Sequence, residues 1–336
     1  MVRQLTSLYT PIINRARPAW GAVYYTSNTR AAFAAVRAVF GRQVRGVVAE
    51  LLAERDPDVV LSVHPLLNHV SYQAIRSSAR GRGLMTVVTD LMDIHRGWIF
   101  PRSDLIVVPT EKALLTALRR RADPQRVKVL GLPIDLRFRP PALGERAALR
   151  RFFGLREDVF TILISGGGMG SGRIYQHVKA LASDSHPWQL VVVCGRNLRL
   201  RRQVQRAEFA TPTLNFGFVD SMPELMRAAD VLVGKAGPGT IGEALATGIP
   251  IVVTAYLPGQ ETENVDFVVK SGLGLYAPGA RKLRNAIARL ADPTTSLLDD
   301  LTQRAIAISR PYACLDIARE CLALARTYQA SGQASR

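Results

Sequence analysis

The chain has 336 residues, of which 48% are hydrophobic, and this is enough for two domains with their own cores. It has no run of about 18 uninterrupted apolar residues and no short apolar segment behind a basic start. The sequence therefore predicts neither a membrane-spanning helix nor a secretion signal, and we expect a cytoplasmic protein. The three cysteines fit no zinc spacing and are expected to be buried thiols: Cys194, Cys314 and Cys321.

The formal net charge is +17, and the first fifty residues carry seven arginines against the single acid Glu50. A basic face of this kind attracts nucleic acid or an anionic membrane, where each basic residue near the lipids contributes about 1 kcal/mol. Only six of the 44 basic residues are lysines, so part of the excess can also be a compositional habit of the source. Composition alone leaves these alternatives open.

In chain order, helical patterns over residues 1–57 are followed by short runs rich in valine, isoleucine and leucine that alternate with helical patterns. This alternation is typical of α/β folds with parallel sheets covered on both faces. The predicted strands are Asp58–Val63, Leu84–Thr89, Asp104–Val108, Val127–Leu130, Val159–Ser165, Gln189–Cys194, Asp230–Gly234 and Pro250–Thr254.

A segment rich in proline and glycine, residues 131–141, separates the fourth and fifth predicted strands and has the character of a linker. We therefore predict an N-terminal Rossmann-like domain over residues 1–135 and a C-terminal one over 136–310. A last helix, within 311–336, can pack back on the first domain. A doubly wound sheet normally opens with a strand, a glycine-rich turn and a helix, and no such unit precedes Asp58, so the N-terminal domain is expected to be incomplete.

The residues from Gly234 to Leu245 join an apolar strand to a helix through a glycine-rich turn. Free N–H groups and the positive dipole end of the helix favour a phosphate there. Gly237, Pro238 and Gly239 keep side chains away from the place where a phosphate approaches. Thr240 and Glu243 also have the spacing of a capping box, which needs no ligand. We favour phosphate binding, because a capping box does not require such residues before it.

A second glycine-rich loop, residues 165–172, follows the first strand of the C-terminal domain. It does not fit the dinucleotide fingerprint, because Ser171 replaces the third glycine, and no Lys-Ser or Lys-Thr pair makes it a P-loop. This argues against a nicotinamide dehydrogenase and against a P-loop ATPase. The loop is either a simple tight turn or a place of close ligand approach, and we assign Gly167 and Gly168 to the ligand.

Gln260 and Asn264 are four residues apart, so on a helix that begins after Gly259 they share a face and can hydrogen-bond sugar hydroxyls. The alternative is a polar first turn in which Glu261 and Glu263 are favoured by the helix dipole. The neighbouring phosphate turn favours the binding role.

Polar residues also follow two strands of the N-terminal domain, at the strand ends where open sheets bind ligands. Asp90 or His95 can serve there as a general base, with packing or capping as the alternative role. A metal site at His64 and His69 is disfavoured, because their spacing does not align them on a helix. No metal site and no cofactor are predicted.

Taken together, these motifs resemble the monogalactosyldiacylglycerol synthase and processive diacylglycerol glucosyltransferase family, whose members are inverting GT-B enzymes related to the glycosyltransferase that completes lipid II. The segments that carry the resemblance are 237–245, 258–265, 64–66 and 86–91, and more loosely 20–24. The resemblance implies two Rossmann-like domains that face a cleft. Members open with a strand and a glycine-rich loop ending in histidine, the usual candidate base; this chain begins beyond it. We favour a start upstream of Met1 over a base relocated to Asp90 or His95.

The resemblance further implies roles for single residues in binding a UDP-sugar donor. The backbone at Phe218 and Val219 would read the uracil, and Gly237, Pro238, Gly239 and Thr240 would hold the diphosphate. Glu243 would accept the ribose hydroxyls, and Gln260, Glu261 and Asn264 would contact the donor sugar. Fixed N–H donors at a helix end can stabilise the diphosphate leaving group without a metal.

The resemblance thus implies an inverting glycosyltransferase that moves a hexose from a UDP-sugar to diacylglycerol or a related lipid. We expect it to be peripheral on the inner face of the plasma membrane, with its basic N-terminal segment facing anionic headgroups, and we expect no nucleic acid partner. A UDP-sugar epimerase of the same fold and a non-catalytic UDP-sugar-binding relative remain the alternatives.

Overall fold

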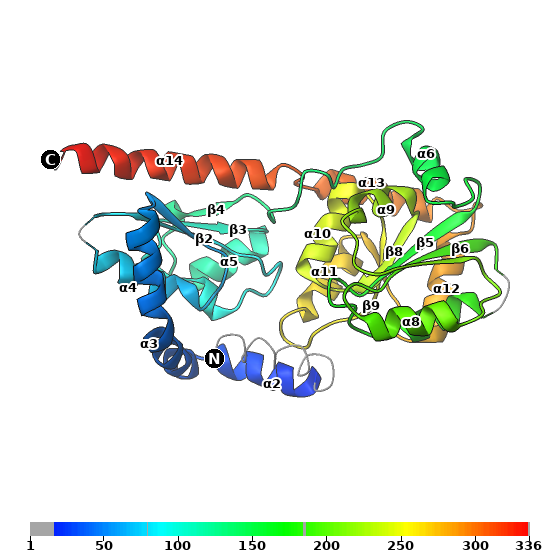
Figure 1. Ribbon diagram of the computed structural model, residues 1–336, viewed down its shortest axis with the longest axis horizontal. Helices are drawn as coiled ribbons and strands as arrows, with labels where there is room; N and C mark the ends of the chain where they lie inside the picture. Colours follow the sequence, from blue (N-terminus) through cyan, green and yellow to red (C-terminus); the bar gives the residue numbers. More distant parts are fainter. Residues whose placement is uncertain (1–16, 79, 184–185, 335–336) are drawn as a thin grey trace. The chain divides into compact units, whose positions relative to one another are not determined.

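The computed structural model describes residues 17–78, 80–183 and 186–334, which divide into two compact units (Figure 1). The unit that we call N-terminal contains the described residues up to Pro133, the short segment Pro258–Glu263, and the chain from Tyr312 onward. The C-terminal unit contains Ile134–Leu257 and Asn264–Pro311. All eight predicted strands are confirmed, each within two residues of its predicted bounds.

The N-terminal unit is built on a parallel sheet of four strands in the order β1-β2-β3-β4. The strands are β1 (Val59–Ser62), β2 (Gly83–Val87), β3 (Leu105–Val108) and β4 (Val127–Val129). The helices are α2 (Arg17–Ser27), α3 (Arg30–Arg55), α4 (Leu67–Arg76), α5 (Glu111–Arg119) and α14 (Ala313–Ala334), with 3-10 turns η1 (Arg96–Trp98) and η2 (Pro124–Arg126).

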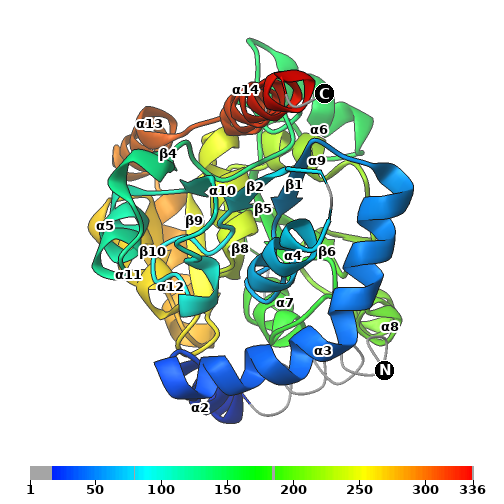
Figure 2. The same ribbon diagram turned by 90° about the vertical axis from the view of Figure 1, so that its left-hand side faces the viewer.

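Alternation along the strands sends apolar side chains to both faces of this sheet, and different helices cover the two faces (Figure 2). Met85 and Val87 point to the face on which Ile317 of α14 packs. Leu84 points to the opposite face, where α3 and α4 cover it. The last helix of the chain is thus part of the core of the N-terminal unit, and an ion pair of 2.6 Å between Lys128 and Glu320 adds to its attachment.

The C-terminal unit is built on a parallel sheet of six strands in the order β10-β9-β8-β5-β6-β7. The strands are β5 (Phe160–Ser165), β6 (Trp188–Val193), β7 (Thr213–Phe216), β8 (Val231–Lys235), β9 (Ile251–Ala255) and β10 (Gly274–Tyr276). The helices are α6 (Glu145–Phe152), α7 (Ile174–Ala182), α8 (Leu198–Arg206), α9 (Met222–Ala228), α10 (Pro238–Thr247), α11 (Thr262–Lys270), α12 (Ala280–Leu290) and α13 (Leu297–Ile308).

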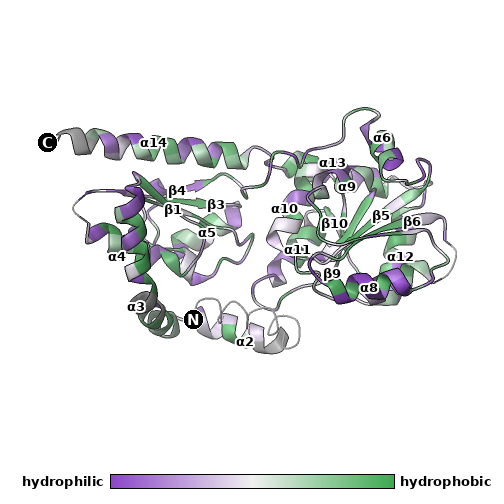
Figure 3. Ribbon diagram, viewed as in Figure 1, coloured by the Kyte–Doolittle hydropathy of each residue, from purple (hydrophilic) through white to green (hydrophobic). Residues whose placement is uncertain are grey.

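The inner strands of this sheet are almost uniformly hydrophobic, whereas α8 is mostly hydrophilic (Figure 3). Because such strands are buried on both faces, they can be predicted from the sequence as apolar runs. The two edge strands β7 and β10 lack this pattern, since β7 is only half-buried and β10 has three residues. Neither was predicted.

The expectation of an incomplete N-terminal domain concerns in part residues 1–16, which lie outside the described residues. From residue 17 onward the chain forms α2 and α3 before it reaches β1, as the helical patterns indicate. In the described part of the chain, no helix combines the length and the apolar character that crossing a membrane requires. The prediction of three buried thiols is correct for Cys194 and wrong for Cys314 and Cys321, which are half-buried on α14.

Candidate functional site

The two glycine-rich segments of the C-terminal unit follow neighbouring strands. The chain runs from β5 outward through β6 and β7 and then returns to the other side of β5, so β5 and β8 pair directly and Ile164 lies opposite Val233. Strand order reverses at this point, and open α/β sheets bind ligands at the carboxyl ends of strands that flank such a reversal. Residues 166–172 and 236–239 lie at those two carboxyl ends.

The loop after β5 is fastened to the turn after β6. The backbone N–H of Arg196 donates to Gly168 O at 2.9 Å, and Asn197 Nδ2 donates to Gly170 O at 3.1 Å. Gly170 has a φ of +58°, and a Cβ there would lie 2.0 Å from Cys194 O. Gly167 is also left-handed, but a Cβ on it would meet nothing within 4 Å. The loop therefore packs through Gly170 and leaves open space at Gly167.

Replacing Gly170 by alanine should destabilise the protein by about 2 to 4 kcal/mol, from the left-handed φ and the overlap with Cys194 O together. Gly144 offers a matched control, because its φ is +75° and nothing lies within 4 Å of the added Cβ. Gly144→Ala should cost only about 1 kcal/mol. Urea denaturation followed by circular dichroism compares the two variants, and equal losses of stability would contradict the packing role of Gly170.

The turn after β8 leads into α10 without a side-chain cap. Gly237 is the N-cap residue and Pro238 is the first helical residue, so Thr240 is the third and Glu243 the sixth residue of the helix. The capping-box interpretation of Thr240 and Glu243 is therefore wrong. The N–H groups of Gly239 and Thr240 belong to the first turn, where no helical carbonyl reaches them, and a Cβ on Gly239 would meet nothing within 4 Å. This is an open helix N-terminus of the kind that binds anions.

Glu243 points from α10 into a partly buried position. No hydrogen bond or ion pair joins its carboxylate to any of the described residues 17–78, 80–183 and 186–334. Burial, and secondarily the charge of Asp135, raises the pKa of Glu243 to about 7. A carboxylate that loses solvent and gains no protein partner is suited to accept hydrogen bonds from a ligand.

Phe218 and Val219 follow β7 at the same edge of the sheet. The Phe218 ring is 52% exposed, and the Arg196 guanidinium carbon lies 4.5 Å from its centroid. Gly168 lies next to this ring, since a Cβ there would be 3.8 Å from it. Arg196 was not predicted as a site residue, although its place directly after β6 is the signal that singled out the other loops.

Gln260 and Asn264 do not share a helix face. The helix α11 begins at Thr262, and Gln260 lies in the preceding turn, where the Thr262 hydroxyl accepts a hydrogen bond of 2.9 Å from Gly259 N. The helix was predicted to begin directly after Gly259, so its predicted start was two residues too early. The buried Glu261 lies in the same turn.

Both carboxamides are nevertheless held in place by their nitrogen atoms. Asn264 Nδ2 donates to Ala236 O at 2.9 Å, within the C-terminal unit, and Gln260 Nε2 donates to Asp90 Oδ1 at 3.1 Å, within the N-terminal unit. Their oxygens, Oδ1 and Oε1, are buried and have no hydrogen-bond partner among the described residues. Buried acceptors without partners are rare in folded proteins, and hydroxyl groups of a ligand would satisfy them.

Asp90, which the sequence analysis named as a candidate base, is buried, with 5% of its surface exposed. Its Oδ1 accepts from Gln260, and its Oδ2 accepts from Trp98 Nε1 at 2.7 Å and from His95 N at 3.4 Å. Burial raises the pKa of Asp90, while the hydrogen bonds from Gln260 and Trp98 oppose that shift. Such a carboxylate is a stronger base than an exposed one.

His95 is occupied by the protein itself. Its Nδ1 accepts from Gly97 N at 3.0 Å, which caps η1, and its Nε2 lies 3.2 Å from Ser27 Oγ. Burial lowers the pKa of His95 to about 4, so the ring is neutral. With both nitrogens engaged, His95 has the capping role that was its alternative. Asp90 accepts three hydrogen bonds, and since a carboxylate has about four acceptor sites, it stays a candidate base. Among the described residues, no three His, Cys, Asp or Glu side chains are grouped to hold a metal ion.

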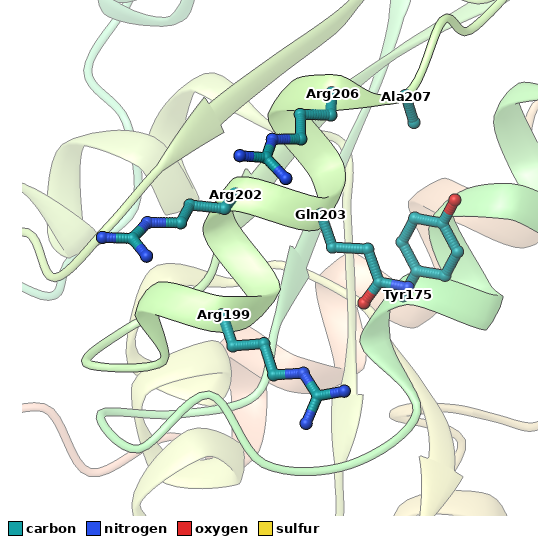
Figure 4. Close-up of a pocket in the computed structure, with 6 residues that line it drawn as sticks. All are labelled: Tyr175, Arg199, Arg202, Gln203, Arg206 and Ala207. Atoms are coloured by element: carbon teal, nitrogen blue, oxygen red, sulfur yellow. The ribbon is translucent and has the colours of Figure 1, made fainter.

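A separate hollow of the C-terminal unit lies between α7 and α8 and contains none of these residues (Figure 4). Tyr175 of α7 faces Gln203 of α8 across it, and Arg202 and Arg206 extend away from Tyr175. It is an open basic surface, distinct from the glycine-rich turns.

Comparison with known proteins agrees with this geometry. Residues 2–134 match the family model described as monogalactosyldiacylglycerol (MGDG) synthase, and residues 161–308 match the model of the glycosyltransferase family 28 C-terminal domain. A probable monogalactosyldiacylglycerol synthase, chloroplastic, of Glycine max is 32% identical over 332 residues, which are 96% of this chain and 62% of that protein. The chain spans about three fifths of the length of the curated relatives it matches.

Two solved structures show the fold. MurG of Acinetobacter baumannii has a TM-score of 0.62 at 15% identity and covers 83% of this chain and 77% of its own. The UDP-GlcNAc 2-epimerase of Neisseria meningitidis, bound to UDP-GlcNAc, has a TM-score of 0.60 at 14% identity, with 84% and 81% covered. The two parallel sheets with their glycine-rich turns are those of the GT-B fold, and the chain belongs to the monogalactosyldiacylglycerol synthase family.

Proposed function

We propose that this chain is an inverting glycosyltransferase that moves a hexose from a UDP-sugar to diacylglycerol. The names of its curated relatives favour galactose as the hexose. The observation that carries the proposal is the pair of glycine-rich turns at the ends of β5 and β8. Beside it stand side-chain oxygens of Glu243, Asn264 and Gln260 that accept no hydrogen bond from the described residues.

The donor would bind mainly to the C-terminal unit. The free N–H groups of Gly239 and Thr240 would hold the diphosphate beside Gly237 and Pro238, with Gly167 and Gly168 giving room for it. Glu243 would accept the ribose hydroxyls. The uracil would lie at the backbone of Phe218 and Val219. The hexose hydroxyls would bind the free carboxamide oxygens of Asn264 and Gln260 and the carboxylate of Glu261.

In the transfer step, the acceptor hydroxyl oxygen attacks the anomeric carbon from the face opposite to the diphosphate. The new carbon–oxygen bond forms as the bond to the phosphate oxygen breaks, so the configuration inverts. The hydroxyl proton passes to the carboxylate of Asp90, and UDP leaves with the bonding electrons. The α10 N-terminus stabilises the charge that collects on the diphosphate.

We further propose that residues 1–135 form the domain facing acceptor and membrane, and residues 136–310 the donor domain. The seven arginines among the first fifty residues support a peripheral attachment to the cytoplasmic face of an anionic membrane. Such an attachment weakens with salt, because screening shortens the reach of each charge.

The test is transfer of radiolabelled hexose from UDP-galactose, and separately from UDP-glucose, to diacylglycerol in vesicles that contain phosphatidylglycerol. We expect a labelled lipid from UDP-galactose. We also expect vesicle co-sedimentation that is lost in 1 M salt, where the Debye length is on the order of 3 Å. An isomerised UDP-sugar without lipid product would identify an epimerase. Protection of the protein by UDP against heat, with no product from either donor, would identify a binding protein without activity.

A further inference from the structure

The short segment Pro258–Glu263 follows β9 of the C-terminal unit in sequence, but by its contacts it belongs to the N-terminal unit. Three parts of that unit hold it. Lys112 of α5 pairs with Glu263 at 2.8 Å, and Asp90 accepts from Gln260. The third part is α2, which precedes the sheet in sequence and which no motif singled out for the donor.

Tyr24 of α2 packs its ring directly against Gly259. A Cβ on Gly259 would lie 2.7 Å from Tyr24 Cδ1 and 3.1 Å from Cγ, so the ring occupies the side of the backbone that glycine leaves free. Gly259 has a φ of +84°, a conformation that the ring helps to enclose. One turn earlier, Gly21 approaches Pro258, since a Cβ there would be 3.0 Å from Pro258 Cβ. The backbone before Gln260 thus rests on α2.

Tyr24 is itself fixed. It is 5% exposed, and its Oη donates to Asp93 O at 2.9 Å. Burial, and then the charges of Asp90 and Asp93, raise its pKa far above the usual range, so the phenol keeps its proton. Just beyond it, Asn28 Oδ1 accepts from Arg96 N at 2.7 Å. The end of α2 is therefore tied to the loop that carries Asp90.

We propose that Tyr24 is a positioning residue for the donor hexose: its ring sets the backbone at Gly259 and thereby the direction in which Gln260 and Glu261 face the sugar. This rests on the proposed function. Because the UDP moiety is assigned to residues of the C-terminal unit, loss of the ring weakens the binding of the sugar part and leaves the binding of UDP itself unchanged.

The experiment compares UDP with UDP-galactose as ligands of the full chain in calorimetry. Tyr24→Ala should weaken UDP-galactose about tenfold, the equivalent of one or two hydrogen bonds, and leave UDP within a factor of two or so. Tyr24→Phe keeps the ring and should restore binding to nearly the original value. Tyr25→Ala, on the same helix with a 57% exposed side chain, is the matched control and should bind both ligands normally.

UDP affinity reports folding in each variant, so a selective loss cannot come from unfolding. If Tyr24→Ala does not fold, Gly21→Leu displaces Pro258 from the same side and should give the same selective loss. Equal weakening of UDP and UDP-galactose, or weakening of neither, overturns the positioning role. Absence of lipid product from the original chain, with the selective loss intact, overturns the transferase function and leaves the positioning role in place.

Discussion

Replacing Glu243 by glutamine should weaken UDP binding by roughly 10- to 100-fold, because hydrogen bonds to a charged group contribute about 1.5–3 kcal/mol. The carboxylate offers two charged acceptor oxygens to the ribose hydroxyls, whereas glutamine offers one neutral oxygen and a nitrogen that can only donate. Calorimetric titration with UDP measures the loss. Glu208→Gln, an exposed site of the same unit, is the control and should bind normally.

The fold should tolerate this change, although not through helix capping. Glu243 is the sixth residue of α10, where glutamine has a similar volume and helix propensity. Among the described residues, no hydrogen bond to the carboxylate is lost. Unchanged UDP affinity in Glu243→Gln, with the protein folded, would remove the ribose role.

The pH dependence of UDP binding follows from the same residue. The pKa of Glu243 is raised from 4.5 to about 7, so the free protein carries a protonated carboxyl below that pH and an ionised one above it. Ribose hydroxyls are best bound by the ionised form, and UDP affinity should therefore increase as pH rises from 6 to 8, about one unit either side of that pKa. Glu243→Gln should lack this increase beyond what the phosphate ionisation of UDP itself produces.

The sign for stability is the opposite. A carboxyl whose pKa is raised on folding contributes stability that is fully present below pH 4.5 and is lost as the pH rises through about 7. A rise in pH at this residue thus strengthens UDP binding and lowers the stability of the fold. This is expected for a carboxyl group that is desolvated in order to bind a ligand.

The sequence could predict the sheets and the glycine-rich turns for a clear physical reason. Strands buried on both faces must be apolar throughout, and the turn after β8 must lack side chains if a helix N-terminus is to stay open. These are local requirements, and they are written in adjacent residues. The edge strands β7 and β10 were not predicted, because one side of each meets solvent or a loop and their residues need not all be apolar.

The parts that could not be predicted depend on contacts between distant residues. The start of α11 is set by Gly259 with its left-handed φ and by the Thr262 hydroxyl, so Gln260 falls outside the helix. His95 reads as a base in sequence, yet Gly97 and Ser27 engage both its nitrogens. The packing contact of Tyr24 with Gly259 joins positions more than two hundred residues apart, and no local sequence pattern predicts it.

Replacing Asp90 by asparagine should lower kcat for hexose transfer by about 10²- to 10⁴-fold, the usual contribution of a positioned general base. UDP affinity should not change, because Asp90 is assigned no contact with the nucleotide. The variant also turns an acceptor toward two donors, Trp98 Nε1 and His95 N, into an amide that can satisfy them only in part. A loss of stability of about 1–3 kcal/mol is expected alongside, and thermal denaturation measures it separately from turnover.

Trp98→Phe separates the chemical role of Asp90 from a structural one. It removes the 2.7 Å hydrogen bond to Asp90 Oδ2 and keeps the carboxylate. Because that bond lowers the pKa of Asp90, its loss raises this pKa further. A base works only when ionised, so kcat of the original chain should fall as the pH drops through the raised pKa of Asp90, and in Trp98→Phe this fall should begin at a higher pH. An acid limb that stays in place, or an Asp90→Asn variant that keeps more than a tenth or so of the original kcat, would mean that the proton goes to another group.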